Sequence, residues 1–271
     1  KTRKYINNFS DFMVANRSVS LSLAVVTMLG TELGLITVMY NAQTGINGLF
    51  SSFHIGLAAF IVTLFIGLTG FVVVELRRLK VKSIPEYYNL RFGAKTRVIG
   101  AILLCLGGIL NMGLFLKVGA IFIQSVFGLD PQGSTLIIIM LVLLVLVLIY
   151  TMSGGMISVI VTDYIQYVVL SIGFMFAVFY SINYFGWTGI FLKLEGLRSY
   201  EQIYNPIENK GFAYISWQVV LGFVSAVVWP TAITRVLAIK DVKMVKSQYL
   251  WSSISFLSRF IIPCFLGICA F

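Results

Sequence analysis

The most informative side chain in the sequence is Glu32, a carboxylate near the middle of an apolar run, 21–40. An acid at the centre of a bilayer costs about 2.5–3.5 kcal/mol on insertion scales, so such residues usually face a polar cavity, a partner or an ion path. Gly30 and Gly34 flank Glu32 and weaken a helix there. A helix broken at this depth exposes carbonyls that can coordinate Na⁺ or orient an anionic solute. The alternatives are a structural acid bonded to a neighbouring helix and glycines that serve close packing.

Asp163 is the second acid inside an apolar run. Thr162 and Gln166 are four residues apart, and Asp163 and Gln166 three apart, which predicts one polar helical face. Asp163 would lie about two turns from the cytoplasmic side. An interfacial or snorkelling acid is therefore the alternative to a role beside an ion path.

Three more features interrupt apolar runs. Lys117 could meet Glu32 or the carboxylate of a solute, or it could form a structural ion pair, as Arg259 could. Trp229-Pro230 predicts a break or a simple kink, because proline removes a backbone hydrogen bond that must be satisfied elsewhere.

The sequence has none of the patterns typical of catalysis: no Ser/His/Asp set, no HExxH, no phosphate-binding glycine loop and no CxxC. Its 3 cysteines lie in apolar runs without metal-ligand spacing, so we expect no transition metal and no organic cofactor. The net charge of +10 comes from basic residues in short connections, which does not favour nucleic-acid binding. We therefore expect a transporter rather than an enzyme.

The composition indicates an all-α protein that crosses a lipid bilayer several times. The chain is 59% hydrophobic and only 11% charged, with a mean hydropathy of +0.95. A membrane-spanning helix needs about 20 apolar residues. About seven runs reach this length, at 20–45, 52–76, 98–127, 134–152, 157–183, 213–235 and 248–271.

The distribution of Lys and Arg predicts the orientation. Basic residues precede the first run and gather between the second and third runs and between the sixth and seventh. The connections 41–51 and 128–133 carry neither Lys nor Arg, and 184–212 mixes basic with acidic residues. Because basic loops are retained in the cytoplasm, we predict a multi-pass protein of the cell membrane whose N-terminal end is cytoplasmic.

Four segments, in order along the chain, resemble motifs of the sodium:solute symporter family. The segments are Asp11–Ser18, Ser83–Gly93, Tyr150–Gln166 and Thr234–Asp241. The family motifs that they resemble are, in the same order, DFFVAGRS, TIPEYLEKRFG, YTxxGGxxAVxxTDxxQ and QRxLAAKD. The resemblance implies a leucine-transporter-like fold of two inverted five-helix repeats, in which helices one and six are broken.

The same resemblance implies a division of the chain. Residues 1–271 would form a single transmembrane transporter domain, with 1–19 as a cytoplasmic lead-in and 20–185 as the first five-helix repeat. Residues 186–212 would be an extracellular loop, and 213–271 would begin the second repeat with its first two helices. We expect the chain to be a fragment, because helices eight to ten of the family are missing from it.

By motif position, Gly30 and Leu33 would supply backbone carbonyls to a sodium ion whose hydroxyl ligands come from the eighth core helix. Glu32 would stand where some relatives have an acidic or amide residue, as a charge that tunes the ion site beside it. Asp163 would match an aspartate near the inner sodium path, and Trp229 would lie near the solute. The implied activity is Na⁺-coupled symport of a small organic solute into the cell by alternating access.

Two other classes remain open. A transporter-like sensor joined to a signalling module would share these motifs, and the sequence after Phe271 would distinguish it. A channel would need rings of pore-lining charge or repeated filter loops, and the sequence shows neither. Relatives carry sugars, amino acids, vitamins and osmolytes, among which Lys117 favours a solute with a carboxylate.

Overall fold

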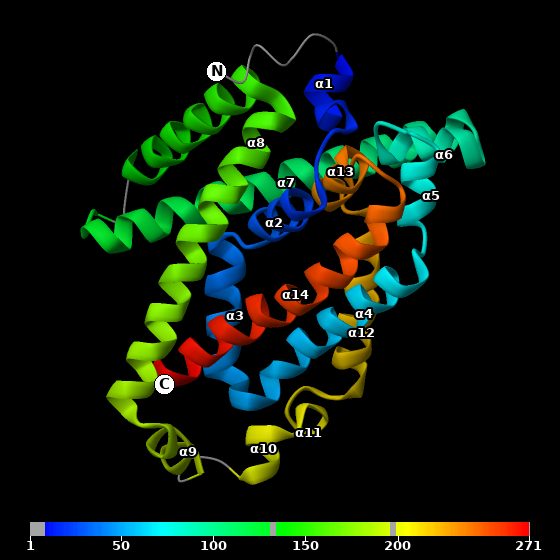
Figure 1. Ribbon diagram of the computed structural model, residues 1–271. Helices are drawn as coiled ribbons and strands as arrows, with labels where there is room; N and C mark the ends of the chain where they lie inside the picture. The colour runs from blue at the N-terminus through cyan, green and yellow to red at the C-terminus, as the bar shows by residue number, and fades with distance from the viewer. Residues whose placement is uncertain (1–8, 131–133, 196–198, 271) are drawn as a thin grey trace.

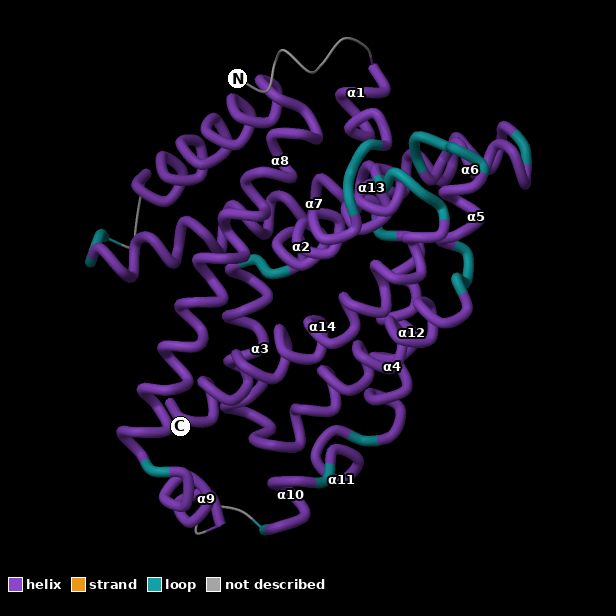
Figure 2. Tube along the Cα trace, in the orientation of Figure 1, coloured by secondary structure: helices purple, strands orange, loops and turns teal. Residues whose placement is uncertain are grey.

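The computed structural model describes residues 9–130, 134–195 and 199–270, and all of the regular elements in these ranges are helices (Figures 1 and 2). Two residues, Val19 and Ile239, form an isolated bridge outside any strand. The predicted all-α fold is confirmed. The helices are α1 Phe9–Val14, η2 Ala15–Arg17, α2 Leu21–Glu32, α3 Leu35–Gly48, η3 Leu49–Phe53, α4 His54–Thr69, α5 Val73–Arg78, α6 Ile84–Phe92, α7 Ala94–Phe127, α8 Ser134–Phe185, α9 Trp187–Glu195, α10 Tyr200–Tyr204, α11 Pro206–Lys210, α12 Phe212–Val228, α13 Pro230–Ala238 and α14 Lys243–Ala270.

The first apolar run is broken, as predicted, but only at the C-terminal end of the expected segment. Helix α2 ends at Glu32, Leu33 and Gly34 are not helical, and α3 begins at Leu35. Gly30 stays helical, and a Cβ added to it would lie 2.5 Å from the backbone oxygen of Asp163. Gly30 therefore allows α2 to pack directly against the backbone of α8.

The sixth apolar run is broken as well. Helices α12 and α13 meet at an angle of 44° at Trp229, whose backbone is extended with φ −67° and ψ 121°. Pro230 opens α13, where a missing N–H costs nothing because the first turn has no intrahelical acceptor. Both predicted breaks are therefore present in the structure.

The fourth and fifth runs are continuous as one long helix, α8, which changes direction at Gly155 (Figure 1). Gly155 has φ 52° and ψ −148°, a conformation that L residues rarely adopt. The described residues contain four helical stretches that are long and apolar enough to cross a membrane, or five with the bent α12–α13 pair. The protein is thus a multi-pass membrane protein, and the count of seven spans stays a prediction.

Helix α14 runs through the middle of the molecule and packs against α2, α3, α4 and α8 (Figure 1). Small residues let the backbones of α3 and α14 touch: a Cβ on Gly45 would overlap the carbonyl oxygen of Cys264, and one on Gly267 would overlap that of Ala42. Small residues at crossings are typical of membrane helices, whose association depends on close packing.

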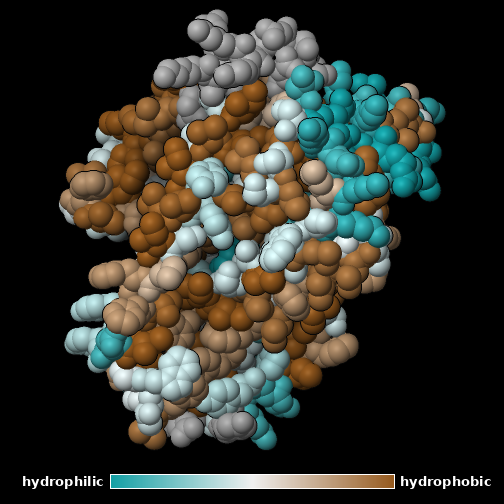
Figure 3. Space-filling view, in the orientation of Figure 1, coloured by the Kyte–Doolittle hydropathy of each residue, from teal (hydrophilic) through white to brown (hydrophobic). Residues whose placement is uncertain are grey.

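Hydrophilic side chains gather at one end of the molecule, around α5 and α6 (Figure 3). There the buried guanidinium of Arg77 donates hydrogen bonds to the carbonyls of Ile239, at 2.8 Å, and Lys240, at 3.1 Å. The backbone of Val19 pairs with the same segment, because the N–H of Lys240 donates to its carbonyl at 3.0 Å. The connection after α13 is thereby tied to the start of α2.

We expect Gly45→Ala to lower the thermal unfolding midpoint of the full-length protein in detergent. The new methyl group must displace the backbone of α14, and overpacking of this kind costs about 1–3 kcal/mol. Gly113→Ala on α7 is the matched control, because an added Cβ there meets no atom within 4 Å. Equal midpoints for the two variants would contradict the close α3–α14 contact.

Candidate functional site

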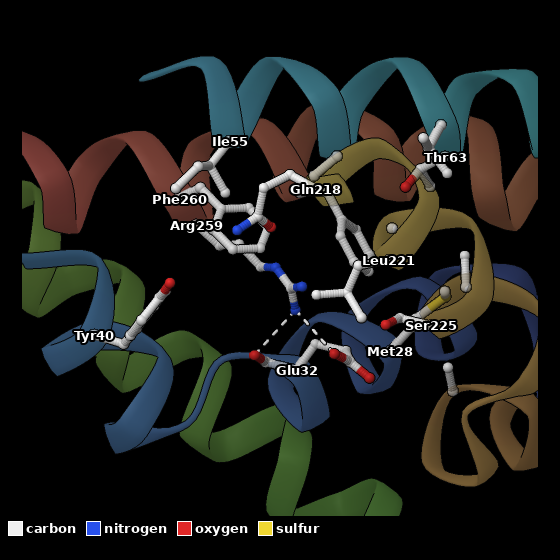
Figure 4. Close-up of a pocket in the computed structure, with 16 residues that line it drawn as sticks. Met28, Glu32, Tyr40, Ile55, Thr63, Gln218, Leu221, Ser225, Arg259 and Phe260 are labelled. Carbon is white, nitrogen blue, oxygen red and sulfur yellow. Dashed lines mark hydrogen bonds and ion pairs between the residues drawn. The ribbon is translucent and has the colours of Figure 1, made fainter. Parts of the chain in front are cut away.

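A cavity of about 280 Å³ lies where the broken helices come together (Figure 4). Its size is near the lower end of the range for small-molecule sites, about 300–1,000 Å³. Most of its wall is apolar, and its polar groups come from α2, α3, α4, α12 and α14. The lining residues are Met28, Glu32, Tyr40, Ile55, Ala59, Val62, Thr63, Gln218, Leu221, Gly222, Ser225, Ala226, Ala232, Phe256, Arg259 and Phe260.

Glu32 and Arg259 are the two charged residues of this lining, and they form an ion pair. Nη1 of Arg259 donates to the Glu32 carboxylate at 3.1 Å and to the Glu32 backbone carbonyl at 3.0 Å (Figure 4). The guanidinium lies 4.0 Å from the ring centre of Phe256 and 4.6 Å from that of Phe260. Arg259 therefore balances the charge of the acid. It also donates a hydrogen bond to a carbonyl that has no backbone partner because the helix breaks there.

Lys117 does not fill the role that Arg259 has. Its side chain is exposed on α7, away from the cavity lining, and it forms no ion pair within the described part of the chain. Of the alternatives for Lys117, the contact with Glu32 is wrong, and a structural ion pair is not seen among the described residues; Arg259 forms the structural ion pair expected of it. The two basic residues lie in similar apolar runs, and the helix packing decides which of them faces α2. Trp229 lies at the break between α12 and α13, but the cavity lining does not include it.

A second ion pair joins α2, α8 and α13. Oδ2 of Asp163 accepts hydrogen bonds from Thr27 at 2.5 Å, from Thr31 at 2.8 Å and from Arg235 at 3.0 Å. Asp163 is only 7% exposed, so the interpretation of it as a snorkelling acid is wrong, while its depth in the membrane stays a prediction. Its charge is balanced inside the protein, as buried charges generally must be.

The polar face of α8 differs from the predicted one. Asp163 and Gln166 both point at α2, and the Gln166 amide donates to the carbonyl of Leu33 at 3.3 Å. Thr162 is exposed instead and bonds to carbonyls of its own helix, those of Ser158 and Val159. The break in α2 is thus contacted by α14 on one side and by α8 on another.

Sequence reasoning missed Thr27, Thr31 and Arg235 as parts of this arrangement. The spacing of four between Thr27 and Thr31 places both hydroxyls on one face of α2, which could have marked them. Arg235 stands in a basic connection, where topology alone explains a positive charge. Among the residues that the structure describes, no three His, Cys, Asp or Glu side chains come together as a metal site.

An apolar helical protein with two broken spans, and with a cavity lined by residues on both sides of those breaks, has the architecture of a secondary transporter. A model of the sodium:solute symporter family matches residues 12–270, and the chain therefore belongs to that family. The family consists of transporters rather than enzymes, and the resemblance seen in the sequence motifs is confirmed.

Individual relatives agree with this assignment. The putative sodium-dependent multivitamin transporter of Drosophila melanogaster is 25% identical over 183 residues, which are 66% of this chain and 28% of that protein. Sodium/glucose cotransporter 4 of Danio rerio is 34% identical over 118 residues, which are 42% of this chain and 17% of that protein. The alignments thus span less than a third of either relative.

A solved structure shares the fold. A Na⁺-coupled sialic acid symporter in a substrate-bound, outward-open state superposes with a TM-score of 0.84 at 18% identity. The superposition covers 99% of this chain and 56% of that one. The predicted leucine-transporter-like fold is confirmed by this likeness, and the chain spans about half the length of the symporter.

We expect the Asp163–Arg235 pair to behave as one energetic unit. Asp163→Asn or Arg235→Gln alone leaves a buried charge without its partner, which typically costs about 3–5 kcal/mol. The double variant should therefore be more stable than the sum of the single effects predicts, as measured by thermal unfolding in detergent. The exposed Arg78–Glu75 pair is the control, and its cycle should give less than about 1 kcal/mol. Additive effects at Asp163 and Arg235 would contradict the buried pair.

Proposed function

We propose that the protein carries a small organic solute into the cell together with Na⁺ by alternating access. The observation that carries this proposal is the cavity at the two helix breaks, in a chain of the sodium:solute symporter family. Secondary transporters bind their solutes at discontinuous helices, because helix ends and free backbone groups supply polar contacts in mid-membrane. We take residues 20–185 as the first repeat, 213–271 as the start of the second, and the N-terminal end as cytoplasmic.

The sodium site in this proposal lies on the α8 side of the break in α2. The backbone carbonyls of Gly30 and Leu33 would be ligands, because Na⁺ prefers hard oxygen donors. The bond from Gln166 to the Leu33 carbonyl is long, at 3.3 Å, and is therefore easily exchanged for an ion. Asp163, which contacts α2 before the break, would attract the cation. Glu32 would adjust the local charge from the cavity side.

The coupling follows from the charge of the ion. Moving one positive charge down a membrane potential releases about 2.3 kcal/mol per 100 mV, to which the sodium concentration gradient adds. If Na⁺ binds the outward-facing state more tightly than the inward-facing one, it shifts the population toward the state that accepts solute from outside. The two events are then linked without any direct contact between ion and solute.

We expect uptake of labelled solutes by the full-length protein in proteoliposomes to require Na⁺ and to saturate with it. The measurement holds the membrane potential constant and replaces Na⁺ by K⁺ or choline, so that only the identity of the ion changes. Uptake that proceeds equally in all three salts would contradict Na⁺-coupled symport.

We expect Asp163→Asn to raise the Na⁺ concentration needed for half-maximal uptake, because it removes a carboxylate and leaves the positive charge of Arg235 without its partner. Rates are normalised to folded protein, since the variant also loses a buried ion pair. Glu75→Gln serves as the control, because Glu75 is an exposed partner of Arg78 remote from the cavity. An unchanged Na⁺ dependence in Asp163→Asn would make Asp163 a purely structural acid.

A further inference from the structure

The cavity contains one negative and one positive side chain, and this charge balance limits what can bind there. Glu32 and Arg259 are 20% and 12% exposed in their side chains, so both are largely withdrawn from water yet line the open space. The remaining polar groups of the lining are few, namely the hydroxyls of Tyr40, Thr63 and Ser225 and the amide of Gln218. The two charges therefore dominate recognition.

Arg259 keeps unused donors in this arrangement. Both of its bonds to Glu32 come from a single nitrogen, Nη1. Its Nη2 makes no hydrogen bond to the residues that the structure describes, whereas its Nε, which also lacks a partner there, is shielded from solvent. A guanidinium has five N–H groups in a planar fork that matches a carboxylate, so Arg259 can bind a second carboxylate with donors that Glu32 does not occupy. The rings of Phe256 and Phe260 hold the guanidinium in place for this role.

The net charge of the bound solute follows from electrostatics in a low-dielectric site. A solute with a carboxylate alone would compete with Glu32 for Arg259, so that the Glu32 carboxylate would lose its partner in the cavity, which is costly away from water. A solute with an ammonium group alone would leave a positive charge unbalanced at Arg259 for the same reason. A zwitterion leaves the total charge at zero, since each of its groups takes over one partner of the existing pair.

We propose that the solute is a zwitterion of amino-acid size, whose carboxylate binds Arg259 and whose ammonium group binds Glu32. This inference rests on the proposed transport function and specifies its substrate class. The apolar wall, which includes Met28, Val62 and Leu221, then receives the solute's side chain. A sugar would fit poorly, because its many hydroxyls would meet mostly apolar surface.

The test is binding to the purified full-length protein in Na⁺ buffer, read out as the ligand-induced rise in unfolding temperature. The probes are L-alanine, L-leucine and L-phenylalanine, with N-acetyl-L-leucine, L-leucinamide and D-glucose as matched analogues. At least one of the amino acids should stabilise the protein. N-acetyl-L-leucine keeps only the carboxylate and L-leucinamide only the ammonium group, so each should bind at least about tenfold more weakly than L-leucine.

Variants test the assignment of the two partners. Arg259→Gln and Glu32→Gln should each raise the half-maximal concentration of the amino acid at least about tenfold, and Arg259→Lys, which keeps the charge, should be weakened less. Glu75→Gln should bind like the wild type. If Arg259→Gln does not fold, the analogue series on the wild-type protein decides alone.

The outcomes separate this inference from the proposed function. Stabilisation by D-glucose but by none of the amino acids, no stabilisation by any probe, or equal binding of L-leucine and N-acetyl-L-leucine would overturn the zwitterion. Na⁺-driven uptake of another solute class would leave symport standing. Binding of amino acids with the expected analogue pattern, but without Na⁺-dependent uptake, would support the zwitterion site and overturn symport.

Discussion

The rest of the structure depends on one constraint, that backbone groups inside a membrane must find hydrogen-bond partners within the protein. The break between α2 and α3 frees carbonyls at Glu32 and Leu33, and other helices satisfy both. Arg259 reaches the first from α14, at 3.0 Å, and Gln166 reaches the second from α8, at 3.3 Å. Thr37 adds a bond from α3 to the Glu32 carbonyl, at 3.2 Å. The break is thus the point at which three packed helices meet.

The sequence predicts the parts that local chemistry determines. Apolar length identifies a multi-pass helical protein, Pro230 identifies the break in the sixth run, and the motifs identify the family. Contacts between side chains of different helices are harder to predict from the sequence, because they depend on which face of each helix packs against its neighbour. Lys117 and Arg259 are each a lone cation in an apolar run, and only the packing of α14 against α2 selects Arg259. Gly30 is a second example. A glycine beside a break can either interrupt the helix or allow close packing against another helix, and Gly30 allows close packing against α8.

The two buried acids place α2 between two sets of partners. Glu32 holds it to α14 beside the cavity, whereas Asp163 holds it to α8 and α13 through Thr27, Thr31 and Arg235. A displacement of α2 relative to α8 or α14 must therefore alter at least one ion pair. Packed interfaces have discrete arrangements rather than a continuous range, which agrees with the alternating access proposed above.

The Asp163–Arg235 and Glu32–Arg259 ion pairs differ in their burial and in their surroundings. The Asp163 side chain is 10% exposed and accepts three hydrogen bonds on one oxygen, so loss of Arg235 would leave a largely buried charge without its ionic partner. Glu32 is 20% exposed, faces open space, and is bound by an arginine whose Nε has no partner in the described chain. A buried pair seldom stabilises a protein more than apolar packing of the same volume does. In the transport cycle proposed above, the Glu32–Arg259 pair is where the solute exchanges contacts, and the Asp163–Arg235 pair stays intact during that exchange.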